Sequence, residues 1–227
     1  MTKEERLQNE YQRLSSMYEE QHRITEGYSY VFGIDEAGRG PLCGPVAAAC
    51  CLLEDDLILP CLNDSKKLSE KKREELYDEI LSNCLSYGIG LVGPERIDEI
   101  NILNATYEAM NDAFEDCLAR LEEKGMDRSL LRNSSVVLVD GNRRVPQLRA
   151  SQITVIGGDS KCPSISAASI LAKVTRDRLL VEYDRLYPEY GFAKHKGYGT
   201  AAHIEALGKY GPTPIHRMSF IQKFIHG

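Results

Sequence analysis

One short stretch places the strongest constraint on how this chain folds, because an apolar strand runs directly into two acids and a glycine-rich loop. It reads FGIDEAGRGPLCGP, residues 32–45, and its acids are Asp35 and Glu36. Adjacent carboxylates repel each other unless positive charge lies between them, and a metal ion is the obvious source of that charge. Side chains alternate along a strand, so both acids face one site only if the strand ends or twists between them. We expect Ala37 and Gly38 to supply that break.

The order of the expected elements indicates an α/β protein with a mixed sheet. Short apolar runs predict strands, and longer segments with helical spacing predict helices. Short connections favour antiparallel pairing of the first three strands, and strands followed by alternating helix and strand are typical of a mixed sheet flanked by helices. We expect strands at 28–35, 45–53, 87–93, 134–142 and 151–159, and helices at 94–125, 164–188, 200–209 and 217–225.

The chain divides into three expected parts. Residues 1–28 are a polar helical extension in which apolar residues recur at helical spacing and no chemistry is visible. Residues 29–188 are the core, and residues 189–227 are a small C-terminal helical part.

The termini and the cysteines predict a cytoplasmic protein that does not enter a membrane. The longest apolar stretch, at 46–53, is too short to span a bilayer, and the charged N-terminus is not a signal peptide. The seven cysteines are odd in number and show no C-x-x-C spacing, which argues against a disulfide framework or a zinc site. The formal net charge of −6 disfavours a nucleic-acid partner on its face, but local basic patches and bound cations decide how phosphate is met.

Three expected strands end on acids, namely Asp35 with Glu36, Asp140, and Asp159. In open α/β sheets ligands gather at the strand ends. Four carboxylates without a nearby histidine or thiolate suit a hard cation, and they are typical of a site for two Mg²⁺ or Mn²⁺ ions in phosphoryl chemistry. A single Asp-Gly at a strand end is usually a plain turn, but three acidic ends in one domain favour a joint site.

Several glycine-rich and basic segments are candidates for contact with phosphate or sugar. The loop Gly38, Arg39, Gly40 exposes backbone N–H groups beside an Arg fork, although a lone G-R-G is more often a tight turn. Ser65 and Lys66 open a basic segment, 63–76, that is equally typical of a solvated helix face. Lys196 and Tyr198 lie in AKHKGYGT, 193–200, where an aromatic residue among basic ones suits a nucleic-acid backbone.

Together these segments resemble bacterial ribonuclease HII. The matching motifs are GIDEAGRGPLCGPV, DSKKLS, VLVDG, GGDSK…SISAASILAKVTRD and HKGYGT, which occur in that family's order over roughly residues 29–220. The extension before residue 28 lies outside these motifs, and the longer N-terminal domain of the ribonuclease HIII type is not seen.

The resemblance implies a ribonuclease H-like core, a monomer, and a C-terminal part that contacts substrate. It implies cleavage of RNA in RNA–DNA hybrids and at single ribonucleotides in duplex DNA, giving 5′-phosphate and 3′-OH ends. It also implies that two Mn²⁺ or Mg²⁺ ions bind to Asp35, Glu36, Asp140 and Asp159. The Gly38–Gly40 loop would then read the ribonucleotide and Tyr198 would pack on the neighbouring sugar, while Asp177 is expected to be structural and to pair with a nearby Arg.

Two other functions stay open from the residues themselves. One is a different two-metal nuclease of the ribonuclease H type, which would not need to sense a single 2′-OH. The other is a nucleic-acid-binding module that keeps the acids for structure only.

Overall fold

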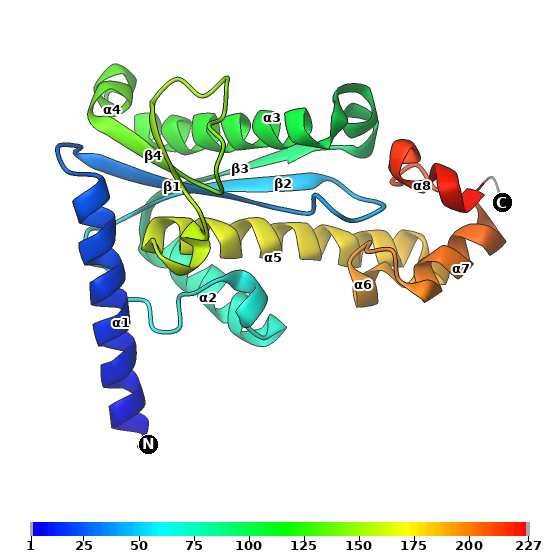
Figure 1. The fold of residues 1–227 in the computed structure, drawn as a ribbon, viewed down its shortest axis with the longest axis horizontal. Coiled ribbons are helices and arrows are strands. Elements are labelled where there is room, and N and C mark those ends of the chain that lie inside the picture. The colour runs from blue at the N-terminus through cyan, green and yellow to red at the C-terminus, as the bar shows by residue number, and fades with distance from the viewer. Residues whose placement is uncertain (1, 226–227) are drawn as a thin grey trace.

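The computed structural model describes residues 2–225, which form a mixed five-stranded sheet in the order β3-β2-β1-β4-β5 (Figure 1). The strands β1 (Tyr30–Ala37), β2 (Val46–Leu53) and β3 (Cys84–Val92) pair antiparallel, as expected. Strands β4 (Ser135–Asp140) and β5 (Ser151–Val155) extend the sheet parallel to β1. The expected α/β class with a mixed sheet flanked by helices is therefore confirmed.

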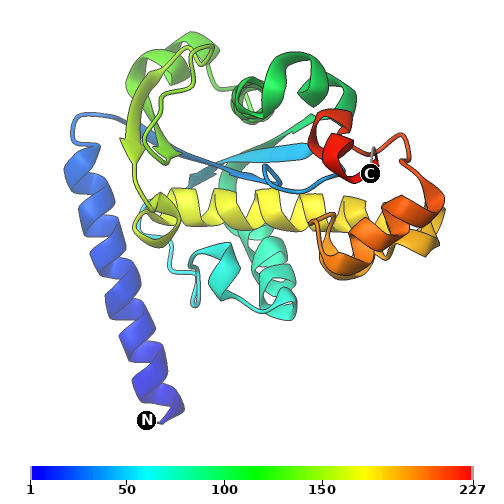
Figure 2. The same ribbon diagram turned by 45° about the vertical axis from the view of Figure 1, so that its right-hand side comes forward.

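Helices cover both faces of the sheet and make three layers (Figures 1 and 2). One face carries α3 (Pro94–Glu123), and the other carries α5 (Pro163–Leu186) with α2 (Glu70–Asn83) beside it. The sequence patterns did not predict the short helices α4 (Arg128–Ser134) and α6 (Phe192–His195), nor the 3-10 turns at 65–67, 158–160 and 188–190. No helix within residues 2–225 is long and apolar enough to cross a membrane.

Glycines let the helices approach the sheet closely. A Cβ on Gly33 of β1 would lie 2.1 Å from the backbone of Ser164 in α5, and one on Gly88 of β3 would lie 2.1 Å from the carbonyl of Ala113 in α3. No side chain fits at either distance, so these positions need glycine. Gly90, whose added Cβ would lie 1.9 Å from the carbonyl of Ala109, serves the same close packing of β3 on α3 as Gly88.

Two apolar layers follow from this arrangement. Phe32, Ile34 and Val139 face α3, where the ring of Phe114 meets that of Phe32 edge-on at 5.3 Å. A second layer lies between the sheet and α5 with α2. A fully buried side chain of this size stabilises the fold by about 1.5–3 kcal/mol. The sheet is thereby held rigidly between its helices, which fixes the positions of its strand ends.

The N-terminal helix α1 (Lys3–Ile24) is joined to the core, although in Figure 1 its N-terminal half projects away from it. Leu14 and Met17 are buried in the layer beside α5. The hydroxyl of Tyr18 donates to the carbonyl of Leu57 at 2.8 Å. At the far end of the helix, Gln21 Oε1 accepts from the hydroxyl of Ser164, at the start of α5, at 2.8 Å. The helix therefore buttresses α5 as well as extending the chain.

The C-terminal part packs on the second half of α5, beyond the end of the sheet (Figure 2). It contains α6, α7 (Ala201–Tyr210) and α8 (Met218–Ile225), of which α7 and α8 match the two helices expected in the tail. Residues 226 and 227 lie outside the described part of the chain. Asp98 of α3 caps α8, because its Oδ2 accepts from the backbone N–H of Met218 at 2.7 Å. The C-terminal part is thereby held to both helical layers.

A buried histidine pair in this part predicts an acid-sensitive stability. His203 and His216 hydrogen-bond through their Nε2 atoms at 3.0 Å, and burial lowers both pKa values, that of His216 to about 4. An unfolded histidine titrates near 6.5, so the unfolded chain takes up protons first as the pH falls. We expect the free energy of unfolding to fall by about 2–3 kcal/mol between pH 6.5 and 4 on account of His216. Denaturant unfolding of His216→Gln should show a shallower fall; an unchanged slope would contradict this.

Candidate active site

The sheet topology brings the predicted acids together at one edge. The parallel pairing of β1 with β4 ends at Ile34 and Val139, so the next residues, Asp35 and Asp140, open the same end of the sheet. Asp159 arrives from the turn that joins β5 to α5. Strand ends of this kind are where α/β sheets bind ligands. The fold therefore assembles the acids without needing them to be close in sequence.

Two details differ from the expectation. β1 does not break between its acids: pairing with β2 continues to Ala37, and Asp35 and Glu36 keep the alternation of a strand. The carboxylate of Asp35 lies beside Ser169 of α5, whereas Glu36 lines a cleft together with Thr106 of α3. The side chains of Asp35 and Glu36 therefore point to opposite faces of the strand.

The second difference concerns Asp159. The strand expected over 151–159 ends at Val155, because Gly157 takes the left-handed conformation (φ +66°) and begins a 3-10 turn, Gly158–Ser160. Asp159 lies on that turn and not on a strand end. The backbone N–H of Gly158 donates to Asp140 Oδ1 at 2.7 Å, so the turn is held against the end of β4. The position of Asp159 is therefore set by Asp140 itself.

The acids repel one another strongly. Burial, and then the charges of Glu36 and Asp140, raise the pKa of Asp35 well above its usual value. Burial also raises the pKa of Glu36, although Arg39 opposes the rise through an ion pair of 3.2 Å between Nη1 and Oε1. The pKa of Asp159 is raised by burial and by neighbouring acids. A site with these charges is incomplete without positive charge.

Besides Arg39, Lys66 is a side chain that supplies positive charge here. Its Nζ lies 3.7 Å from Asp159 Oδ2. Burial disfavours the charged form of Lys66, but Asp35, Asp159 and further acids outweigh burial and raise its pKa. Lys66 and Arg39 carry two positive charges between them, which is fewer than the number of carboxylates in the cluster. The donor set of carboxylate oxygens fits hard divalent cations such as Mg²⁺ or Mn²⁺.

The carboxylates do not close on a single point. Within the described residues, the one group of three His, Cys, Asp or Glu side chains whose ligand atoms all lie within 4.8 Å of one another is Cys43, His203 and His216. The acids at the sheet edge are spread more widely than that. Such spacing is compatible with cations that keep water and phosphate oxygens in their shell, as Mg²⁺ does.

Two site residues were missed from the sequence. The carboxylate of Asp64 lies near Asp159 and its charge helps to raise the pKa of Asp159, and Ser169 lies beside Asp35 and shares a hydrogen bond with the hydroxyl of Ser65. The sequence did carry a signal for Asp64, since the tripeptide Asp-Ser-Lys that contains it at 64–66 occurs again at 159–161, where it contains Asp159. Ser169 lies inside a helix among other small residues, where nothing in the sequence distinguishes it.

The glycine-rich loop runs from the acids along the cleft. Gly38 has φ +92°, and a Cβ there would lie 1.9 Å from Nε of Arg176, so this position needs glycine for both reasons. A Cβ on Gly40 would lie 3.7 Å from Cε1 of Tyr198, which places the tyrosine ring against the loop. The loop and the ring therefore form one continuous wall.

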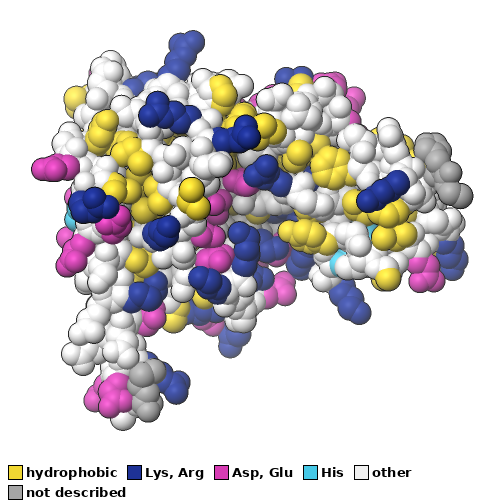
Figure 3. Space-filling view, viewed as in Figure 1, with side chains coloured by type: hydrophobic (Ala, Val, Ile, Leu, Met, Phe, Trp, Pro, Cys, Tyr) yellow, Lys and Arg dark blue, Asp and Glu magenta, His cyan; other side chains and the backbone are white. Residues whose placement is uncertain are grey.

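The loop and Tyr198 bound a cleft of about 200 Å³ that begins at the acids. Figure 3 shows Lys and Arg side chains gathered around the hollow between the sheet and the C-terminal helices. An acidic centre with a basic rim suits a phosphate chain that approaches bound cations. The residues lining the cleft are Glu36, Ala37, Gly38, Arg39, Gly40, Ser65, Lys66, Ser169, Lys173, Arg176 and Tyr198.

The remaining predicted residues fall in or beside the same cleft. Ser65 is buried, and its hydroxyl is shared with Ser169 at 2.9 Å. Lys196 is bent back, with its Nζ 3.3 Å from Glu70, whereas the ring of Tyr198 is 48% exposed and free to meet a ligand. Asp177 is structural in its contacts, but its ion-pair partner is Lys173 at 2.6 Å and not the arginine that we expected.

A mixed sheet of this order, with an acidic strand-end centre and a basic cleft, defines a hydrolase of the ribonuclease H fold. A family model described as Ribonuclease HII matches residues 32–223. The chain belongs to the ribonuclease HII family, whose members are metal-dependent endoribonucleases. They cleave the RNA of RNA–DNA hybrids and ribonucleotides within DNA, and this is the activity of the chain.

Individual relatives agree with this assignment. Ribonuclease HII of Caldanaerobacter subterraneus subsp. tengcongensis is 48% identical over 222 residues, covering 97% of this chain and 86% of that protein. Ribonuclease HII of Ruminiclostridium cellulolyticum is 49% identical over 217 residues, covering 95% of this chain and 80% of that protein. The crystal structure of ribonuclease H2 from Pyrococcus horikoshii OT3 is similar with a TM-score of 0.61 at 28% identity, covering 86% of this chain and 97% of that one.

Proposed function

We propose that Asp35, Glu36, Asp140 and Asp159 hold two divalent cations, Mn²⁺ or Mg²⁺, at the edge of the sheet. The observation that carries this is the convergence of these acids at one sheet edge, where burial, and then the charges of Glu36 and Asp140, raise the pKa of Asp35 well above its usual value and cations would relieve both effects. Bound there, the cations would supply Lewis-acid stabilisation of charge on the scissile phosphate and would activate water for in-line attack. Cleavage on the 5′ side of a ribonucleotide would leave 5′-phosphate and 3′-OH ends.

The chain's own residues would orient the nucleic acid around this centre. Lys66, whose Nζ lies beside Asp159, would contact a non-bridging oxygen of the scissile phosphate. Arg39 would exchange its ion pair with Glu36 for contact with the substrate backbone when cations occupy the acids. Ser65 and Lys196 would stabilise the wall of the cleft through their hydrogen bonds within the protein. Ser65 shares its hydroxyl with Ser169, and Lys196 donates to the carbonyl of Ala193.

The Gly38–Gly40 loop and Tyr198 would read the sugar. The 2′-OH is the group that distinguishes RNA from DNA at one position. Gly38 and Gly40 would let the loop backbone approach that hydroxyl closely, and the exposed ring of Tyr198 would pack on the next deoxyribose. A general two-metal nuclease does not need such a wall, and a binding module without catalysis does not need a centre of unpaired acids.

The direct test is cleavage of a DNA duplex that carries one ribonucleotide, with Mg²⁺ and with Mn²⁺, followed by mapping of the product ends. We expect a single cut on the 5′ side of the ribonucleotide and no cut in the all-DNA duplex. Equal cleavage of both duplexes would favour a general nuclease, and binding without cleavage would favour the non-catalytic module.

The protein is further proposed to act as a monomer in the cytoplasm. The cysteines of the described residues are all free, as expected of a reducing compartment.

A further inference from the structure

Arg217 is a fully buried arginine whose side-chain partners are carbonyl oxygens of residues 38–44, the segment that contains the Gly38–Gly40 loop. Its Nη2 donates to Gly38 at 2.6 Å, its Nη1 to Arg39 at 3.0 Å and to Pro41 at 2.9 Å, and its Nε to Gly44 at 3.0 Å. The planar guanidinium offers donors in a fixed fork, so four carbonyls are held in one arrangement. The residue lies more than 170 positions away in sequence from the loop that it organises.

The charge of Arg217 makes these contacts strong. Burial and the neighbouring Arg176 lower its pKa to about 9, which leaves the guanidinium charged at neutral pH. Within the described residues its hydrogen bonds all go to carbonyls, so these oxygens must compensate for the lost hydration. The loop and the guanidinium therefore depend on each other.

Holding the carbonyls also fixes the direction of the loop's N–H groups. No peptide bond of the described chain is cis, and in a trans peptide the C=O of one residue and the N–H of the next point in opposite directions. The carbonyls of Gly38 and Arg39 point at Arg217, so the N–H groups of Arg39 and Gly40 point away from it. No hydrogen bond between described residues uses these two N–H groups, which leaves them available to a ligand in the cleft.

The segment that carries Arg217 is docked on the same loop by its backbone. The N–H of Arg217 donates to the carbonyl of Leu42 at 2.9 Å, and the N–H of Gly44 donates to the carbonyl of Ile215 at 2.8 Å. These bonds flank a short antiparallel bridge between Cys43 and His216. Arg217 is thus placed by its own main chain, independently of its side chain.

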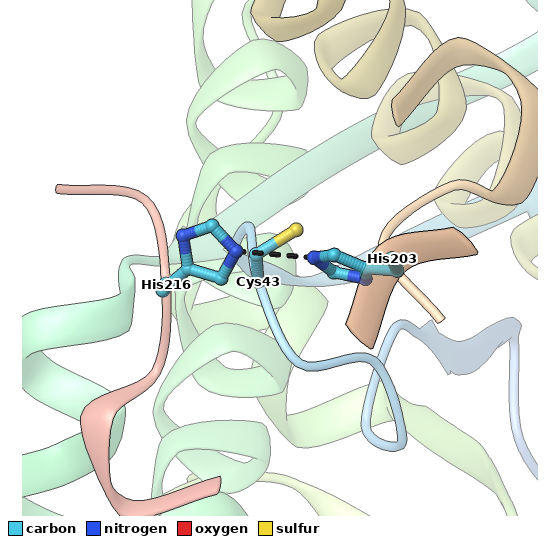
Figure 4. Close-up of side chains that lie close together, drawn as sticks. All are labelled: Cys43, His203 and His216. Carbon is cyan, nitrogen blue, oxygen red and sulfur yellow. Dashed lines mark hydrogen bonds between the residues drawn. The ribbon is translucent and has the colours of Figure 1, made fainter. Parts of the chain in front are cut away.

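A chain of hydrogen bonds links this segment to Tyr198. The carbonyl of Tyr198 can only accept, so His203 Nδ1, 2.9 Å away, carries a proton. The backbone N–H of Thr213 donates to His216 Nδ1 at 2.9 Å, so that nitrogen carries none. His216 Nε2–H must then donate to the bare Nε2 of His203 across the 3.0 Å contact drawn in Figure 4. Both rings are neutral, and every bond in the chain points towards Tyr198.

The same geometry argues against a metal ion among Cys43, His203 and His216. A cation would need the lone pair of His216 Nε2, which would move the proton to Nδ1. There the N–H of Thr213 would oppose it at 2.9 Å, and only the hydroxyl of Thr213, at 2.8 Å, could accept it. Burial also raises the pKa of Cys43 to about 12, which disfavours the thiolate that zinc requires. The structure assigns these histidines to the hydrogen-bonded chain.

We propose that Arg217 is a positioning residue for ribonucleotide recognition: it holds the loop with the N–H groups of Arg39 and Gly40 turned towards the cleft, while the histidine chain from the same segment holds Tyr198 opposite. This proposal rests on the proposed reading of the 2′-OH by the loop. A single embedded ribonucleotide offers one correct register, whereas a continuous hybrid offers a 2′-OH in every register. Loss of positioning should therefore harm the first substrate more.

The test compares kcat/KM of Arg217→Gln and Arg217→Lys on a single-ribonucleotide duplex and on a continuous hybrid. We expect Arg217→Gln to lose about tenfold or more on the first substrate and no more than about threefold on the second. Lys keeps the charge but not the fork, so an intermediate loss with the same selectivity is expected, and this variant carries the test if Arg217→Gln does not fold.

The control is Leu207→Ala, which opens the apolar cluster of the C-terminal part but removes none of the hydrogen bonds made by Arg217 or by the histidine pair. It should lower the melting temperature and reduce both activities by the same factor. An equal loss on both substrates in the Arg217 variants would overturn the positioning role. One zinc per chain in the purified protein, measured by elemental analysis, would contradict the assignment of His203 and His216 to a hydrogen-bonded chain. Failure of the unmodified protein to cut the single-ribonucleotide duplex would instead reject the proposed function.

Discussion

Asp140→Asn is expected to reduce cleavage by at least about a hundredfold, because the amide keeps the shape of the side chain but not the charge that would hold a cation in the transition state. The amide oxygen can still accept from the N–H of Gly158, so the turn that carries Asp159 should stay in place. Asp35→Asn should behave in the same way. The measurement is the single-turnover rate on a duplex with one ribonucleotide, and near-normal activity in either variant would reject the assignment.

A stability measurement separates this role from a structural one. The acids repel each other in the metal-free protein, so removing one charge relieves repulsion. We expect the melting temperature of Asp35→Asn without divalent cations to equal or exceed that of the unmodified protein. If the acids served only as a structural ion-pair cluster, the same substitution would lower it.

Tyr198→Ala is expected to cost roughly tenfold or more on a single embedded ribonucleotide. Stacking of aromatic rings on nucleic acid is worth about 1–3 kcal/mol, and packing on a sugar lies at the lower end. Tyr198 is half exposed and lies against Gly40, so truncation removes one side of the cleft without opening the apolar core. A continuous hybrid should be affected less, because other registers can still be cut.

Tyr198→Phe is the matched variant for this residue. Packing acts through shape and apolar area, so the ring should matter more than its hydroxyl. Phe should therefore retain much more activity than Ala in initial rates on both substrates. Should Phe prove as damaging as Ala, the hydroxyl would be the functional group and the packing account would be wrong.

The sequence predicted the sheet and the meeting of the acids because both follow from local patterns. Apolar runs that end on Asp35 and Asp140 place those residues at strand ends, and parallel neighbours then bring them to one edge. The expected strand end at Asp35 was wrong, because the local sequence could not show that β2 keeps pairing with β1 as far as Ala37; the break at Gly38 comes only after both acids. Strand length here is decided by the partner strand and not by the sequence of β1.

Features that depend on distant contacts could not be read from the chain. Arg217 is one basic residue in a tail, and its importance comes from four carbonyls far away in sequence. Likewise, α4 is only seven residues long, and its cap at Asp127 resembles an ordinary turn in sequence. The buttressing of α5 by α1 depends on Gln21 meeting Ser164, which no local pattern predicts.

The central claim is that the acids at the sheet edge form a divalent-cation centre, and calorimetric titration with Mn²⁺ in the absence of substrate tests it most directly. We expect the unmodified protein to bind Mn²⁺ and Asp140→Asn to bind it at least about tenfold more weakly, because a carboxylate ligand is lost. Identical isotherms for the two proteins, or no binding by the unmodified protein, would contradict the account.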